Sequence, residues 1–147
     1  MLLWNLMFLF VVLIDQTTKY LVMSKLPLGD SFIIINDFIY LSPVQNRGIT
    51  LGAFQKSWYF YSILILVILC AFFCYVTKSK NTYLKLSSTL IAGGFIGNLI
   101  DFFLKGSVID FLNIKILSLT FPNTNFADIF IVAGITVFIT HFINKES

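Results

Sequence analysis

The pattern of apolar and polar positions divides the chain into four long apolar runs separated by more polar segments. A helix crosses a bilayer with about 17 to 25 predominantly apolar residues, and each run reaches that length. The predicted membrane helices cover residues 2–23, 58–76, 84–104 and 126–143. We therefore expect residues 1–147 to form a single integral membrane domain, built as an all-α four-helix bundle.

Two of the segments between the helices have strand-like patterns. Residues 31–35 and 38–42 are rich in β-prone side chains, and the Asn-Asp pair between them is typical of a tight turn. Residues 112–116 alternate between apolar and polar, which predicts a further strand that Pro122 would end. A small β-sheet is therefore expected beside the helices.

The basic residues predict how the helices are oriented. They are densest in the short turn 78–85, and Lys145 lies in the tail, whereas those of segments 25–57 and 105–125 are widely spread. Because cytoplasmic loops are enriched in Lys and Arg, both termini and the turn are expected in the cytoplasm. The two longer segments are then outer segments, and the small sheet is extracytoplasmic.

Composition agrees with this pattern and excludes several classes of protein. Of the 147 residues, 58% are hydrophobic and only 12% are charged, which is far from the composition of a soluble domain with a polar surface. No length remains for a large soluble catalytic or nucleic-acid-binding domain. The net charge of +3 is accounted for by membrane topology, so no nucleic acid partner is expected.

The cysteines and the histidine offer little chemistry. Cys70 and Cys74 lie four residues apart within the second apolar run, with no further Cys or His pair at zinc spacing, and are interpreted as packing residues. His141 is the only histidine and lies near the end of the last run, where a structural or interfacial role is expected. Mechanisms that need a catalytic histidine have little support, and no metal site is expected.

Polar side chains inside the predicted helices are more informative, because a charged group at mid-membrane costs about 2.5 to 3.5 kcal/mol on insertion scales. Asp15 and Lys19 are spaced i,i+4 on one helical face. Asn98, Asp101 and Lys105 form an i, i+3, i+7 stripe on another helix. Both groups should face the interior of the bundle. For the first pair, a buried structural ion pair and a functional role are both open.

Asp110 and Asp128 differ from the other acidic residues. Neither has a basic residue at helical spacing, and each has hydrophobic neighbours near the predicted outer interface. Two carboxylates brought together in a poorly hydrated site cannot both ionise easily, so the pair would share one proton and could act as acid and base. Spacing alone supports an ion-coupled transporter equally well.

Four separated blocks of the sequence resemble lipoprotein signal peptidase, the type II signal peptidase of bacteria. Each block is weak evidence alone, but the four occur in the family's order and span nearly the whole chain. They are Asp15-Gln16-Thr17-Thr18-Lys19 for D-Q-x-[ST]-K, Asn46-Arg47-Gly48 for N-x-G, Gly97-Asn98-Leu99-Ile100-Asp101 with Val108-Ile109-Asp110-Phe111 for G-N-x-x-D and V-x-D-F, and Asn125-Phe126-Ala127-Asp128 for N-x-A-D.

The resemblance implies an aspartic endopeptidase of the bacterial inner membrane. Such enzymes remove the signal peptide of a prolipoprotein by cutting before a diacylglyceryl-modified cysteine. The lipid-modified precursor and membrane lipid would be the partners of a monomer, with no metal and no cofactor. Asp110 and Asp128 would be the catalytic pair. The supporting polar shell would consist of Asp15, Lys19, Asn46, Gly48, Asn98, Asp101 and Asn125.

The sequence also departs from the family pattern. Phe102 stands where family members usually have an arginine, and Thr124 stands where phenylalanine is common. Lys105 and Arg47 are the candidates to replace the missing cation. Two other functions remain open from the sequence. One is a small ion-coupled transporter, which four helices without an inverted repeat do not favour. The other is a structural assembly protein, which leaves the outer carboxylates unexplained.

Overall fold

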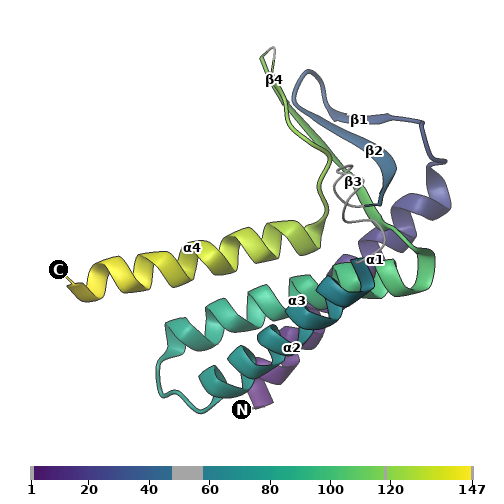
Figure 1. Ribbon diagram of the computed structural model, residues 1–147. Coiled ribbons are helices and arrows are strands. Elements are labelled where there is room, and N and C mark those ends of the chain that lie inside the picture. The colour runs from purple at the N-terminus through teal and green to yellow at the C-terminus, as the bar shows by residue number, and fades with distance from the viewer. Residues whose placement is uncertain (1, 48–57, 118, 147) are drawn as a thin grey trace.

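The computed structural model describes residues 2–47, 58–117 and 119–146, and within them the chain forms four helices and a small sheet (Figure 1). The elements in chain order are α1 (Leu2–Lys25), β1 (Phe32–Ile35), β2 (Ile39–Asn46), α2 (Trp58–Thr77), α3 (Thr82–Lys105), β3 (Val108–Ile116), β4 (Leu119–Thr120) and α4 (Phe126–Glu146). The predicted combination of four helices with a small antiparallel sheet is confirmed. The regular bundle stays a prediction.

Helix α3 is the central element, with α1, α2 and α4 all packed against it. Glycines on α3 allow this close approach. A Cβ atom at Gly93 would lie 2.7 Å from Cγ1 of Val11 on α1, and one at Gly94 would collide with the carbonyl oxygen of Ala127 on α4. The small-residue surface of α3 therefore sets how closely α1 and α4 approach.

Both ends of α3 have caps. The side chain of Asn81 accepts hydrogen bonds from two backbone N–H groups of the first turn, and Gly106 ends the helix with φ 70. Asn81 also bonds to Nε2 of His141 at 2.8 Å, and the His141 ring stacks on Tyr83. His141 therefore has the structural role that the sequence predicts, fastening α4 to the start of α3.

The sheet has the order β1-β2-β3-β4 with every pair antiparallel. The predicted hairpin is confirmed as β1 and β2, and Asp37 in its turn has φ 57. Strand β2 continues to Asn46, beyond the predicted end at residue 42. Pro43 is tolerated within it because the pairing with β3 is irregular between Leu41 and Val44, so no ladder hydrogen bond is lost there.

Strand β3 begins four residues before the predicted start at residue 112. Its residues Ile109, Asp110 and Phe111 are all buried, so the sequence there shows no alternation of apolar and polar positions. The prediction that this strand runs on until Pro122 is wrong. The strand ends at Ile116, where a following residue with positive φ precedes β4.

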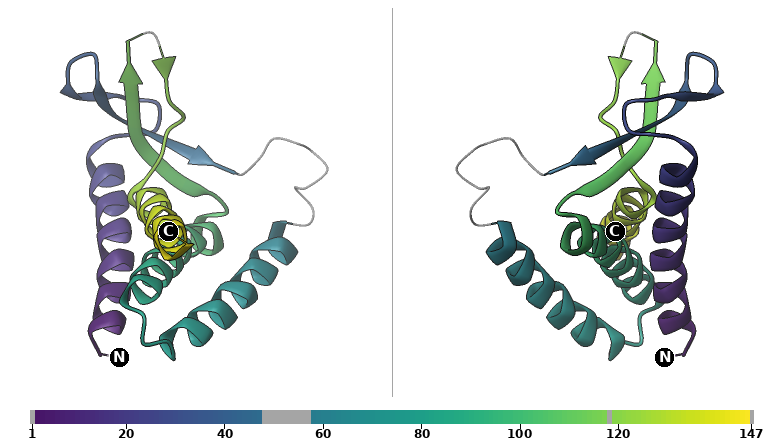
Figure 2. Two further views of the ribbon diagram at one scale, coloured as in Figure 1. Left: turned by 90° about the vertical axis from the view of Figure 1, so that its left-hand side faces the viewer. Right: turned by 90° about the vertical axis from the view of Figure 1, so that its right-hand side faces the viewer.

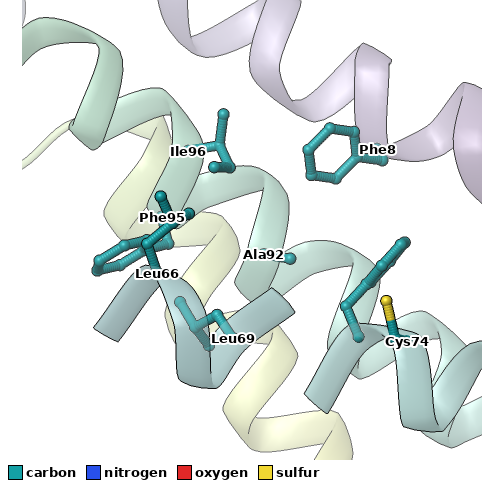
Figure 3. A pocket seen from close by; sticks show the side chains of 8 residues that line it. Phe8, Leu66, Leu69, Cys74, Ala92, Phe95 and Ile96 are labelled. Atoms are coloured by element: carbon teal, nitrogen blue, oxygen red, sulfur yellow. The ribbon is translucent and has the colours of Figure 1, made fainter. Parts of the chain in front are cut away.

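Helix α2 diverges from α1, with the separation increasing toward the sheet (Figure 2). An apolar pocket of about 140 Å³ lies between α1, α2 and α3. In Figure 3 it is lined by Phe8 of α1, by Leu69 and Cys74 of α2, and by Ala92 and Ile96 of α3. Cys74 thus contributes to an apolar lining, whereas the side chain of Cys70 lies outside the described part of the chain.

Three described helices are long and apolar enough to cross a membrane. These spans are Leu2–Lys25, Thr82–Lys105 and Phe126–Asn144. The remaining predicted span coincides with α2. The sheet lies beyond one end of these helices (Figure 1), so side chains near that end lie between the apolar helices and the sheet.

Candidate active site

The predicted site residues that the structure describes gather where α1, α3 and α4 meet the sheet. Several of them are buried despite their polarity. Asp15, Lys19, Asp101 and Asn125 have no exposed surface, and Asp110 is 3% exposed. Gly48 of the predicted shell lies outside the described residues.

A cluster of charges centred on Lys19 forms the base of the site. Lys19 Nζ lies 2.8 Å from Asp15 Oδ2 and 2.9 Å from Asp101 Oδ2, and all three side chains are fully buried. The other oxygen of Asp101 is 2.7 Å from Nζ of Lys105, whose side chain is 40% exposed. Asp15 and Lys19 therefore form a buried ion pair, one of the two roles that the sequence leaves open, and the pair is part of an alternating chain of four charges from two helices.

This charge cluster also holds two backbone segments. Asp15 Oδ1 accepts a hydrogen bond from the backbone N–H of Ala127 at 2.9 Å. Asp101 Oδ2 accepts one from the N–H of Ile109 at 3.3 Å. Ala127 and Ile109 directly precede the two aspartates predicted to be catalytic. The buried carboxylates on α1 and α3 therefore fix the backbone at the start of α4 and in β3.

Two asparagines connect those aspartates. The oxygen of Asn98 faces the ammonium group of Lys19, which can only donate, so the amide nitrogen of Asn98 donates to Asp128 Oδ1 at 2.8 Å. The oxygen of Asn125 likewise accepts from the backbone N–H of Asp128, and its nitrogen donates to Asp110 Oδ1 at 2.6 Å and to Asn98 Oδ1 at 3.0 Å. Because Lys19 Nζ and the backbone N–H of Asp128 can only donate, the orientations of both amide groups are determined.

Asp110 lies within β3 in a buried environment. Burial raises the pKa of its carboxyl group above the ordinary value, and the negative charge of Asp128 acts in the same direction. Hydrogen bonds oppose this effect: Asn46 Nδ2 donates to Asp110 Oδ2 at 2.9 Å, and Asn125 donates to the other oxygen. The electrostatic influence of Asp128 on Asp110 means that the two carboxyl groups act on one another.

Asp128 lies in the first turn of α4, which begins after the capping residue Asn125. Its side chain is partly exposed. Besides the bond from Asn98, its Oδ2 accepts a hydrogen bond from Thr124 Oγ1 at 3.1 Å. The site thus pairs one buried carboxyl group with one that is accessible from outside the protein.

The sequence did not assign two further contributors to the site. Gln16 Nε2 donates to Asp15 Oδ2 at 3.1 Å and to the carbonyl oxygen of Gly97 at 2.9 Å. Its position as an uncharged polar residue next to Asp15 in an apolar run is the signal that could have identified it. At Thr124 the sequence shows only a departure from the family pattern, although its spacing of four from Asp128 permits the contact.

The structure distinguishes the two cations considered as replacements for the missing arginine. Phe102 is 7% exposed, Lys105 binds Asp101 within the charge cluster, and Arg47 lies exposed just after β2. Among the residues that the structure describes, no three or more His, Cys, Asp or Glu side chains are arranged to hold a metal ion.

Long apolar helices with buried carboxylates beside a small sheet are typical of a membrane protein. The family model described as signal peptidase (SPase) II matches residues 7–144. The chain therefore belongs to the signal peptidase II family. Membership makes it a protease, and its apolar helices agree with a bacterial membrane protein.

Known proteins resemble the chain over most of its length. The lipoprotein signal peptidase of Staphylococcus aureus (strain JH9) is 31% identical over 140 residues, which cover 94% of this chain and 86% of that protein. A solved bacterial membrane enzyme, determined by the in meso method at 2.3 Å resolution, matches with a TM-score of 0.87 at 31% identity, over 98% of this chain and 89% of the other. Another, at 1.9 Å, matches with a TM-score of 0.81 at 32% identity, over 95% and 91%.

Proposed function

We propose that this protein removes the signal peptides of bacterial prolipoproteins by cutting before a diacylglyceryl-modified cysteine, with Asp110 and Asp128 as the catalytic pair. The observation that carries the proposal is the bridge of Asn125 and Asn98 between the two carboxyl groups, in a chain of this family. The remaining described shell residues hold this bridge in place. The working unit is a monomer that needs no metal and no cofactor.

In this mechanism the pair shares one proton. We assign this proton to Asp110, the more deeply buried member of the pair, because burial disfavours an ionised carboxylate. Ionised Asp128 takes a proton from a water molecule as the water oxygen attacks the scissile carbonyl carbon, and Asp110 gives its proton to the carbonyl oxygen. When the C–N bond breaks, Asp128 passes its proton to the leaving amine and Asp110 regains one from the intermediate.

The substrate's lipid should matter for a site at the end of membrane helices. Acyl chains that stay in the bilayer would hold the cysteine at a fixed depth and bring the peptide bond to the carboxyl pair, so that positioning lowers the barrier. We expect a precursor with a diacylglyceryl cysteine to be cleaved much faster than the same precursor without lipid. Purified protein in detergent, incubated with both forms and read by mass spectrometry, tests the proposed function. Equal cleavage would indicate a general signal peptidase, and no cleavage of either would contradict the function.

The proposed orientation places both termini and the turn between α2 and α3 in the cytoplasm, with the site at the outer face of the inner membrane. Lys78, Lys80 and Lys85 lie in or beside that turn, in agreement with the enrichment of basic residues in cytoplasmic loops. In a variant without Cys70 and Cys74, a cysteine replacing Lys80 should react with an impermeant label only from the cytoplasmic side. A cysteine replacing Asn36 in the exposed β1–β2 turn should react only from outside. The reverse pattern would contradict the orientation.

We propose that Lys105 supplies the positive charge that an arginine at the position of Phe102 usually supplies in this family. Because Lys105 Nζ lies 2.7 Å from Asp101 Oδ1, and Asp101 holds the backbone next to Asp110, Lys105→Ala should lower cleavage of the lipidated precursor about tenfold or more. Adding Phe102→Arg to this variant should restore part of the activity. Lys25→Ala, at an exposed lysine in the last turn of α1, is the matched control. Full activity of well-expressed Lys105→Ala would show that Lys105 does not replace the missing arginine.

A further inference from the structure

We infer that Thr124 is a positioning residue for the reaction, whose hydroxyl group holds the Asp128 carboxylate in register with Asp110. The inference rests on the proposed function of the two aspartates and adds a residue that its mechanism does not use. It is drawn from one juxtaposition: the backbone of Thr124 is bonded to the strand that carries Asp110, while its side chain is bonded to Asp128.

The backbone of Thr124 joins the site to β3. Its carbonyl oxygen accepts hydrogen bonds from the N–H groups of Phe111 at 3.0 Å and Leu112 at 2.9 Å, and its own N–H donates to the carbonyl oxygen of Leu112 at 2.9 Å. Phe111 and Leu112 immediately follow Asp110 in the chain. The position of Thr124 is therefore fixed relative to Asp110 by three backbone hydrogen bonds.

The side chain of Thr124 makes the connection to the other aspartate. Its Oγ1 donates to Asp128 Oδ2 at 3.1 Å, while Asn98 donates to Asp128 Oδ1 at 2.8 Å. With one donor on each oxygen, the plane of the carboxylate is determined. A hydrogen bond to a charged group is among the stronger ones in proteins, so loss of the hydroxyl group would release one side of a group that must face the attacking water.

The segment just before Thr124 is also tied to the sheet. Asn123 Nδ2 donates to the carbonyl oxygen of Ser42 at 2.7 Å, and its Oδ1 accepts from Asn113 Nδ2 at 2.7 Å. A β-branched side chain on such a fixed backbone has few rotamers available. The hydroxyl group is therefore held in advance at the position that Asp128 requires, which is the condition for effective positioning.

The test compares variants of Thr124 in the full-length protein, with a lipidated prolipoprotein precursor as substrate. Thr124→Val keeps the shape and removes the hydroxyl group, Thr124→Ala removes it together with volume, and Thr124→Ser keeps it. Both deletions should lower kcat by about 10- to 100-fold with KM changed by less than about threefold, whereas Thr124→Ser should stay within about threefold of the parent. Thr140→Val is the control, because the exposed hydroxyl of Thr140 donates to carbonyl oxygens of its own helix, at Thr136 and Val137.

The outcomes separate this inference from the proposed function. If Asp128→Asn is inactive while both folded hydroxyl deletions retain the parent kcat, the positioning role is wrong and the aspartate mechanism stands. If Asp128→Asn is active, the proposed function itself fails. If Thr124→Ser loses as much kcat as Thr124→Val, shape rather than the hydroxyl group matters, and the inference is overturned. If Thr124→Val does not fold, the comparison of Thr124→Ala with Thr124→Ser gives the same decision.

Discussion

Asp110→Asn and Asp128→Asn are each expected to abolish cleavage of a lipidated precursor while leaving a protein that inserts and folds. Asparagine keeps the shape of the side chain, and its single oxygen can still accept from Asn125 at position 110 or from Asn98 at position 128. It cannot share a proton with the remaining aspartate. The double variant should be no worse than either single one, because residues that act as one unit do not lose activity additively.

This prediction is measured by precursor accumulation in a strain that depends on each variant, with protein level checked by immunoblot. Asp37→Asn is a matched control, since Asp37 lies exposed in the β1–β2 turn with φ 57, a conformation that asparagine also adopts readily. Normal processing by a well-expressed Asp110→Asn or Asp128→Asn protein would contradict the two-aspartate mechanism. It would favour the interpretation of these carboxylates as part of an ion-coupled transporter.

The parts of the site that could be predicted from sequence are those set by spacing within one helix. Asp15 and Lys19 are one turn apart on α1, so their ion pair follows from helical geometry. The same holds for Asp101 and Lys105 on α3. The cost of isolated charges in a membrane further predicts that such groups are buried and paired. All four are paired, and Asp15, Lys19 and Asp101 are fully buried, whereas Lys105 is 40% exposed.

Contacts between distant elements could not be predicted in the same way. The bond from the Ala127 backbone to Asp15 joins residues 112 positions apart, and nothing in the local pattern at Asp15 specifies a backbone N–H as its partner. The direction of the amide bridge through Asn98 depends on Lys19, which lies 79 positions away. The sequence shows which polar side chains are present. Which donor binds which acceptor is determined by how α1 and α4 pack against α3.

The sheet shows a second limit of sequence patterns. Alternation predicts a strand only where one face is buried and the other is not. The start of β3 is buried on both faces, and β4 is only two residues long, so neither has a recognisable period. As a result the sequence leaves Asp110 outside the predicted strand, whereas it lies within β3, between β2 and the segment that carries Thr124.

Lys19→Met is expected to be the most destabilising substitution in the charge cluster. It removes the ammonium group that two buried carboxylates share, and it leaves Asp15 with no cation among the contacts described above. Breaking a buried ion pair by deleting one partner typically costs about 3–5 kcal/mol, because an uncompensated charge stays buried. Asp15→Asn should cost less, since Lys19 then retains Asp101 as a partner.

Thermal unfolding in detergent, followed for each variant at equal protein concentration, measures these differences. Lys105→Met is the matched control, because Lys105 binds the same aspartate at 2.7 Å but is 40% exposed, and Asp101 keeps Lys19 as its cation when Lys105 is lost. Its midpoint should stay near that of the parent, while that of Lys19→Met falls by many degrees.

Since Asp15 and Asp101 hold the backbone N–H groups before Asp128 and Asp110, any folded Lys19→Met protein should also cleave slowly. Equal midpoints for Lys19→Met and the parent would show that the carboxylates do not depend on Lys19 for compensation, and that the site is held together by its amide hydrogen bonds instead.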